Sequence, residues 1–346
     1  MSAASAEGLP HTVDHGPGDG SLGDRLWRLP PGCVVRVQPG TYTAPVALPH
    51  DVALVAAQGL GSVTLRAQRG PVISVEGARR VRLEGLLLQG PEAGVGACLQ
   101  VYMASEVEVI GCLLSGGRGR GEGGGAVDVQ QGRVRLWRCR LTRGRAQQGG
   151  GVRAAGACRV ELESCVLSDL SADGIGGGGL FASRNGSILA RGCSFGRCRG
   201  ALGAVALAGG GAGGPGTIEL DHCLLAADAE ESGRPLCGHQ GGSVALRHCV
   251  VPRLQERPSD DGLHLGDGVV GRRVELAPQG ERPFAPRFPG LLFGQGVAWS
   301  TSEPAPADAG WHAEEPRATP PAAHTAPASD VYGRPRGRLW IGAVGE

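Results

Sequence analysis

A repeated cysteine pattern constrains the fold of this chain more than any other feature. Six segments share the order apolar-x-apolar-x-x-Cys-x-apolar, and their cysteines lie at positions 112, 139, 165, 193, 223 and 249. The spacings are 27, 26, 28, 30 and 26 residues. An earlier segment, VRLEGLLL, carries Leu86 in the cysteine position, 26 residues before Cys112. Repetition at a nearly fixed period of this length is the signature of a solenoid or another repeat architecture.

Each period also contains a second short apolar segment, which follows a glycine-rich stretch. Examples are GAVDVQ, GGVRAA, GGLFAS and GAVALA. Both segments alternate apolar and polar residues with period two and are rich in Val, which predicts strands. No stretch sustains a helical period, so we expect no important helix. The fold class predicted is all-β, a parallel β-solenoid with 26–30 residues per coil and coils stacked about 4.8 Å apart.

Three parts of the sequence resemble a known family. The segment PGCVVRVQPGTYTAPVALPHDVALVAAQG (residues 31–59) looks like the first coils of right-handed parallel β-helix proteins of the pectin-lyase-like superfamily, and the six cysteine segments look like its β-helix repeats. The tail DVYGRPRGRLWIGAVGE (residues 330–346) is similar to the ending of many bacterial β-helix repeat proteins. The resemblance implies a right-handed parallel β-helix. It leaves activity open, because the superfamily includes lyases, hydrolases, epimerases, adhesins and non-enzymatic scaffolds.

The composition along the chain predicts three regions. Residues 1–24 are polar and glycine-rich and are expected to be a flexible leader. Residues 25–280 hold the repeats and are expected to form the β-helix. Residues 281–346 are rich in Pro and Ala and are expected to be irregular, with the final WIGAVGE docking as a strand.

The eleven cysteines are interpreted as packed thiols rather than as a disulfide framework. Cysteines in successive coils would lie about 4.8 Å apart with parallel Cα–Cβ bonds, whereas a disulfide needs Cβ atoms about 3.8 Å apart. Such a file of small apolar side chains is compatible with a reducing compartment. A Cys193–Cys198 disulfide is the alternative left open. The predicted structural ladder comprises Leu86, Cys112, Cys139, Cys165, Cys193, Cys223 and Cys249.

Composition excludes several functions. All 34 basic residues are Arg, so sites that need a Lys amine, such as a Walker P-loop, a kinase site or a pyridoxal phosphate Schiff base, cannot be present. The net charge of +1 is too small for bulk attraction to nucleic acid or membranes. No apolar run is long enough to span a bilayer and no secretory signal is visible, so a cytoplasmic location is the default expectation.

Carboxylates near the end of the repeats are the candidates for catalysis. Asp260, Asp261 and His264 lie together, and paired carboxylates can divide acid and base roles in glycoside hydrolysis or bind calcium. Ca²⁺ is therefore the cofactor to consider if the chain is an enzyme, and otherwise we expect none. The polygalacturonase pattern is not met, since Gly238-His239-Gln240 precedes the Asp pair. The alternative interpretation is a solvated acidic turn.

Two histidines occupy matching positions in consecutive repeats. His222, beside Asp221, and His248 each precede a ladder cysteine, so stacking of coils would bring them together on one face. Such a pair can bind a metal or transfer protons. A surface ladder of similar side chains is the simpler alternative, and the sequence alone assigns no metal. The G-x-S-x-G string at residues 192–196 falls inside a predicted strand and is interpreted as coincidental.

Arginine-rich loops are the candidates for ligand binding. Residues 111–200 hold 14 Arg against six acids, a difference of +8. Arg118, Arg120, Arg143 and Arg145 lie in glycine-rich loops, where guanidinium groups one coil apart could clamp carboxylates or phosphates. The alternative is a solubilising surface. Nucleic-acid binding would need aromatic stacking partners, and Trp137 is the only Trp in this stretch.

These observations rank three functions. The first is a non-catalytic β-helix scaffold that binds a protein partner or an acidic polysaccharide along its outer face. The second is a carbohydrate-active enzyme, a polysaccharide lyase or glycoside hydrolase. The third, a nucleic-acid binder, rests only on the arginine loops, so we do not expect nucleic acid as a partner.

Overall fold

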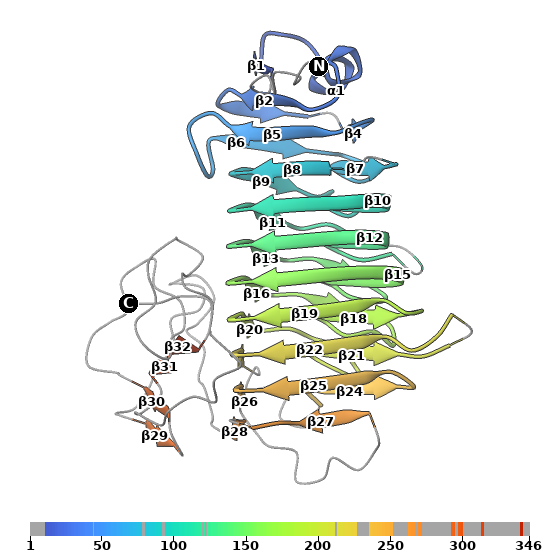
Figure 1. The fold of residues 1–346 in the computed structure, drawn as a ribbon, viewed down its shortest axis with the longest axis vertical. Helices are drawn as coiled ribbons and strands as arrows, with labels where there is room; N and C mark the ends of the chain where they lie inside the picture. Colours follow the sequence, from blue (N-terminus) through green and yellow to red (C-terminus); the bar gives the residue numbers. More distant parts are fainter. Residues whose placement is uncertain are drawn as a thin grey trace, which may run out of the picture.

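The fold is a parallel β-solenoid. The computed structural model describes residues 11–251 and 262–271, apart from positions 44, 78–79, 92–93, 120, 122, 212, 227–234 and 268, together with four short strands between residues 292 and 341. Within the solenoid each strand pairs in parallel with its counterpart one coil away, and the coils stack along the long axis of the molecule (Figure 1). The predicted all-β solenoid is therefore confirmed.

The strands fall into four rows. Row 1 contains β4 (Val46–Leu48), β7 (Ile73–Glu76), the first parts of β10 (Leu99–Ile110), β12 (Val127–Trp137) and β15 (Val152–Glu163), then β18 (Leu180–Ser183), β21 (Ala206–Gly209) and β24 (Cys237–Gln240). Row 2 contains β1 (Thr12–His15), β2 (Cys33–Val37), β5 (Val52–Ala56), β8 (Arg80–Glu84), the second parts of β10, β12 and β15, then β19 (Ser187–Arg191), β22 (Thr217–Asp221), β25 (Ser243–Arg247) and β27 (Leu263–Leu265).

The other two rows complete each coil. Row 3 contains β3 (Gly40–Tyr42), β6 (Val63–Arg66), β9 (Leu86–Gln89), β11 (Leu113–Ser115), β13 (Arg140–Thr142), β16 (Val166–Ser168), β20 (Ser194–Gly196), β23 (Leu224–Leu225), β26 (Val250–Val251) and β28 (Val270–Gly271). Row 4 contains β14 (Arg145–Ala146) and β17 (Ser171–Ala172).

Alternation along row 2 separates the core from the outward face. Val134 and Leu136 of β12 are fully buried, whereas Arg133 and Arg135, which alternate with them, are exposed. The same period of two recurs in β8 and β19. Each fully buried Val or Leu side chain contributes about 1.5–3 kcal/mol, so the stacked apolar positions supply the main stabilisation of the solenoid.

The same turn geometry recurs between rows 2 and 3 in the central coils. The residue before each ladder position has a left-handed backbone, with φ between 50° and 69°. Glycine adopts this conformation freely, and Asn, Asp and His tolerate it better than most other residues. The turn residues are Gly85, Gly111, Arg138, Ser164, Gly192, His222 and His248.

The ladder residues lie inside this turn. Leu86 and the six ladder cysteines are at most 1% exposed, and all eleven cysteines are free thiols, including Cys193 and Cys198. Each ladder thiol donates to backbone carbonyls, as Cys139 does to Val109 O at 3.2 Å and to Trp137 O at 3.4 Å. The thiols therefore act as small buried side chains with satisfied donors.

Glycine-rich segments pack closely between coils just before row 1. The amide of Ala126 donates to Gly150 O, and that of Gly151 donates to Gly178 O and Gly179 O one coil further on. A Cβ at Gly150 would lie 2.7 Å from Gly178 O and also collide with Ser171. Backbones approach too closely here for any side chain, which explains the glycine runs that precede β12, β15 and β18.

The N-terminal end differs from the sequence prediction. Residues 1–24 are predicted to be a flexible leader. Within this range, residues 12–15 form β1, which pairs in parallel with β2. It is followed by α1 (Leu22–Arg28), which is capped by Ser21 and buries Leu22 and Leu26. We had expected no important helix, but α1 covers the apolar end of the first coil (Figure 1). A seven-residue helix shows too few periods to be recognised from its sequence.

The C-terminal strands form a separate sheet. β29 (Leu292–Gly294), β30 (Val297–Trp299), β31 (Ala313–Glu314) and β32 (Trp340–Ile341) pair in antiparallel order. The predicted terminal strand within WIGAVGE corresponds to β32, whose partner is β31. In the part of the chain that the structure describes, no helix has the length and apolarity needed to cross a membrane.

Candidate functional site

The two predicted histidines lie in the turn between rows 2 and 3. His222 follows β22, and His248 follows β25 one coil further on. Their backbones share the left-handed conformation, with φ values of 53° and 50°. Equal backbone geometry in adjacent coils places the imidazole rings face to face, with centroids 4.6 Å apart and planes inclined by 26°. The rings thus stack, as their spacing of one repeat predicts.

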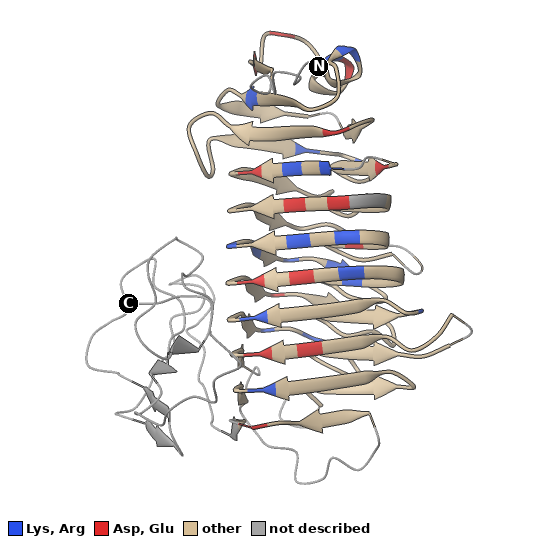
Figure 2. Ribbon diagram, in the orientation of Figure 1, with Lys and Arg blue, Asp and Glu red and all other residues tan. Residues whose placement is uncertain are grey.

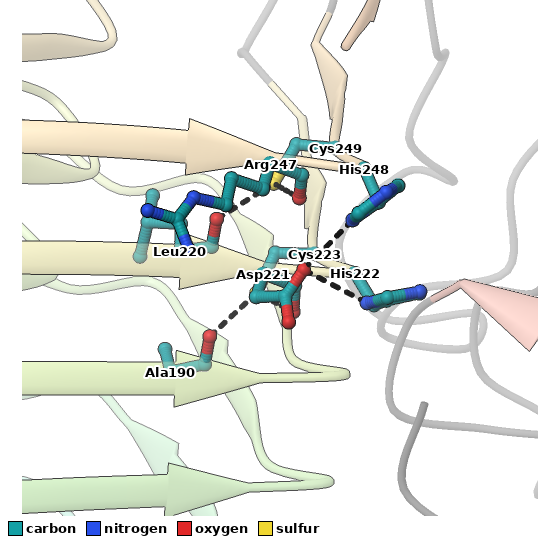
Figure 3. Close-up of polar contacts among 8 residues, drawn as sticks. All are labelled: Ala190, Leu220, Asp221, His222, Cys223, Arg247, His248 and Cys249. Atoms are coloured by element: carbon teal, nitrogen blue, oxygen red, sulfur yellow. Dashed lines mark hydrogen bonds and ion pairs between the residues drawn. The ribbon is translucent and has the colours of Figure 1, made fainter. Parts of the chain in front are cut away.

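Asp221, the last residue of β22, joins the two histidines (Figure 3). Its Oδ1 lies 2.9 Å from His222 Nδ1 and 3.1 Å from His248 Nδ1. The three residues are only 7%, 5% and 8% exposed. Burial opposes ionisation of the carboxyl, but hydrogen bonds and charge interactions with both imidazoles outweigh it and lower the pKa of Asp221 to about 2. The carboxylate is therefore ionised at neutral pH.

The cysteines that follow the histidines point into the core. Cys223 Sγ donates to Ala190 O and Asp221 O at 3.4 and 3.3 Å, and Cys249 Sγ donates to the carbonyls of the equivalent residues one coil on (Figure 3). Burial raises the pKa of Cys223 well above its usual range, which keeps the thiol protonated. The outward donor set consequently consists of two imidazoles and one carboxylate, whose ligand atoms lie within 4.8 Å of one another.

Three exposed arginines occupy equivalent positions in different coils. Arg118 bridges in parallel to Arg145, and Ser171 bridges to Arg145 on one side and Arg199 on the other. Arg118 and Arg145 are therefore one coil apart, at about 4.8 Å, and Arg199 lies two coils beyond Arg145. We call Arg118, Arg145 and Arg199 the arginine row. Neither Arg118 nor Arg145 forms an ion pair with another described residue.

Arginines on the outward face of row 2 have a different environment. One column of side chains on this face alternates in sign from coil to coil (Figure 2). Its members, each in register with the next, are Arg82, Glu108, Arg135 and Glu161. Arg135 pairs with Glu163 at 3.0 Å, and Arg159 pairs with Glu161 at 2.6 Å. A hollow of about 480 Å³ on this face is lined by both signs, including Asp51, Arg80, Arg82, Glu106 and Glu108. These contacts neutralise much of the charge of row 2, although Arg133 and Arg159 face each other in register.

The structure separates the four loop arginines that the sequence grouped together. Arg143 lies two residues before Arg145, in a left-handed turn, and donates to Ser115 Oγ at 2.7 Å. In the same turn two coils on, Arg197 pairs with Asp169 through contacts of 2.5 and 3.0 Å. Arg120 lies outside the described residues. Of the predicted set, Arg118 and Arg145 lie in register among the described residues, whereas Arg143 contacts Ser115.

Arg199 is the member of the arginine row that sequence reasoning did not single out. A spacing rule would have found it, because Arg118, Arg145 and Arg199 each lie six residues after a ladder cysteine. Ser171 occupies this position in the intervening coil. The sequence analysis selected arginines by the glycine-rich loops that contain them and not by their position within the coil, so it did not select Arg199.

The predicted catalytic residues are only partly within the described chain. Asp260 and Asp261 lie outside it. His264 is exposed on β27, opposite Ala245 of β25. His239 lies on β24 against Gly262, whereas Arg247 ends β25 on the outward face of row 2. Ser194 of the G-x-S-x-G string is buried in β20, so the string forms no strand-to-helix elbow.

Comparisons with known proteins find solved structures that resemble this chain. No protein-family model matches the chain, and no curated protein matches it. Among the solved structures is a crystal structure of the pectin methylesterase from Aspergillus niger in deglycosylated form, which is 14% identical in sequence and has a TM-score of 0.43. The alignment covers 78% of this chain and 87% of the methylesterase chain. At this identity the similarity assigns no role to any residue of this chain.

Proposed function

We propose that this protein is a non-catalytic β-solenoid scaffold that binds an acidic polysaccharide along its arginine row. The observation that carries the proposal is the parallel bridge between Arg118 and Arg145, which stacks two exposed like charges in neighbouring coils. Like charges directly opposite each other are destabilising. Arg82, Glu108, Arg135 and Glu161 alternate in sign on row 2. Arg118 and Arg145 have no carboxylate partner among the described residues, which favours an external anion as the counterpart of these two charges.

The spacing of the arginine row suits an extended ligand. Its members repeat at multiples of about 4.8 Å along the solenoid axis, and each guanidinium offers a planar fork of donors that matches a carboxylate. A polymer with carboxylates at regular intervals can satisfy several such forks at once. Multivalent contact of this kind raises affinity without a deep pocket.

Polygalacturonate is the probe for this proposal, with uncharged dextran as the matched neutral polymer. We expect calorimetric binding of polygalacturonate that weakens steeply as salt rises, because counterions must be displaced, and no binding of dextran. The double variant Arg118→Gln/Arg145→Gln should weaken binding at least about tenfold, since two charge-assisted contacts are lost.

The control removes the same net charge from row 2. Arg135→Gln/Arg159→Gln breaks two ion pairs on the neutralised face and should change the dissociation constant less than about twofold. If both double variants weaken polygalacturonate binding equally, the effect is due to net charge and not to the arginine row. Release of new reducing or unsaturated ends from polygalacturonate would instead favour the carbohydrate-active enzyme.

A further inference from the structure

The Asp221, His222 and His248 cluster has the donors and the geometry of a metal centre. Both imidazole Nδ1 atoms converge on one carboxylate oxygen, at 2.9 and 3.1 Å. In a tetrahedral zinc site with bonds of about 2.0–2.1 Å, ligand atoms lie about 3.3 Å from one another. The two distances between imidazole and carboxylate therefore need to lengthen by only a few tenths of an ångström, and all the ligand atoms already lie within 4.8 Å of one another. We propose that Asp221, His222 and His248 bind one divalent transition-metal ion of the zinc class.

The donor types select the class of metal. Two nitrogens and one oxygen suit Zn²⁺, Co²⁺ or Ni²⁺, whereas Ca²⁺ and Mg²⁺ prefer oxygen ligands throughout. Cys223 and Cys249 do not join the set, because their thiols face the core and donate to backbone carbonyls. Three protein ligands leave a fourth coordination position for water or another small ligand.

The backbone already holds the ligands in place. His222 and His248 occupy left-handed turn positions that earlier coils fill with Gly, Arg or Ser. Among the described turns of this kind, histidine occurs only in the coil of Asp221 and in the next coil. The side chains are buried and the turns are fixed by ladder cysteines and by strands on both sides, so little conformational freedom is lost when an ion binds.

Two arginines near the cluster modify its electrostatics. Arg191 and Arg247 lie in register with Asp221, one coil before and one coil after it. Both are exposed, so solvent screens their repulsion of a bound cation. The Asp221 carboxylate, in contrast, is buried, and its attraction for the ion is screened much less. The balance favours binding at the buried donors.

Cobalt is the spectroscopic probe for this site. The full chain, without an oligohistidine tag, is treated with a chelator, dialysed and titrated with Co²⁺ and then Zn²⁺. We expect one ion per chain by calorimetry and visible ligand-field absorption from Co²⁺ that Zn²⁺ displaces. X-ray absorption of the zinc form should show imidazole and oxygen ligands without sulfur.

Asparagine variants test the ligands while keeping the turn. Asn tolerates the left-handed backbone, so His222→Asn and His248→Asn should stay folded by circular dichroism. Each should lose more affinity than the roughly 10–100-fold typical of losing an outer-shell partner. The matched control His264→Asn, which removes an exposed imidazole, and the double variant Arg118→Gln/Arg145→Gln should keep the metal.

Three results would overturn the metal proposal. The first is a folded wild-type protein that takes up no Co²⁺ or Zn²⁺ at stoichiometric concentration. The second is wild-type affinity in both folded asparagine variants, which would place the ion elsewhere. The third is a sulfur-to-cobalt charge-transfer band, which would assign the ion to thiols. None of them bears on polysaccharide binding by the arginine row.

Discussion

The Arg153 guanidinium contacts the Asp128 carboxylate at 2.9 Å, and both side chains are nearly fully buried. They lie next to each other in register on the first parts of β15 and β12, on the side of row 1 that faces away from the core. The glycine-rich segment before β12 covers them, since a Cβ at Gly124 would lie 2.9 Å from Arg153 Cβ. The side of row 1 that faces away from the core is therefore buried at these two residues instead of being exposed to solvent.

Breaking this buried pair should destabilise the protein strongly. Asp128→Ala leaves the Arg153 charge without its carboxylate and is expected to cost about 3–5 kcal/mol of unfolding free energy. The double variant Asp128→Leu/Arg153→Met should recover most of that loss, because neither charge then remains buried. Urea unfolding followed by circular dichroism measures both. A loss below 1 kcal/mol in the single variant would mean that water reaches the pair.

Two glycines should differ in how much stability a substitution costs. Gly150→Ala places a Cβ against the backbone of the next coil and should cost at least about 2 kcal/mol. Gly111→Asn should cost about 1 kcal/mol or less, because its left-handed turn has open space and other coils place Arg, Ser or His there. Thermal unfolding of the two variants compares them directly, and similar losses would refute the close-packing account of the glycine runs.

Acid should weaken the N-terminal coil through His15. Its ring is fully buried beside Tyr42, and neither nitrogen has a hydrogen-bond partner among the described residues. Burial, followed by the charge of Arg25, lowers the pKa of His15, although Asp19 opposes the shift. The unfolded chain binds a proton at about pH 6.5 that the folded chain rejects. Stability is therefore full above that pH and is lost as pH falls through the lowered folded value.

The variant His15→Phe tests this dependence. Between pH 7.5 and 5.5 the urea midpoint of the wild-type protein should fall more than that of His15→Phe, which has no proton to bind. Asp221 does not contribute in this window, since its pKa is about 2. Equal slopes in the two proteins would show that the imidazole titrates alike in the folded and unfolded chains.

The thiols should be inert in the folded protein. All eleven are buried, and burial raises the pKa of Cys98 to about 12, with shifts in the same direction at Cys112, Cys165 and Cys223. Because the thiolate is the reactive form, a chromogenic disulfide reagent should label the native protein slowly and the denatured protein at once. Fast labelling in native buffer would indicate that the coils open locally.

Sequence reasoning reached the fold because its signals are local. A cysteine or leucine every 26–30 residues marks one coil, and alternation of apolar residues marks strands whichever partner they meet. The pairing of His222 with His248 also followed, since equivalent positions in stacked coils must be neighbours. The short helix α1 left too brief a pattern, so the covered N-terminal end was missed.

Contacts between coils were decided by the tertiary structure. The sequence placed Asp221 beside His222 but could not show that its oxygen also faces His248, nor that Arg143 turns to Ser115 while Arg118 meets Arg145. Coil lengths differ by up to four residues, so loop arginines shift relative to one another until pairing fixes them. The sequence by itself determined the repeat, the strands and the buried ladder, because these depend on period and polarity. Only the folded chain set which charged groups meet, because that depends on register and backbone conformation at each turn.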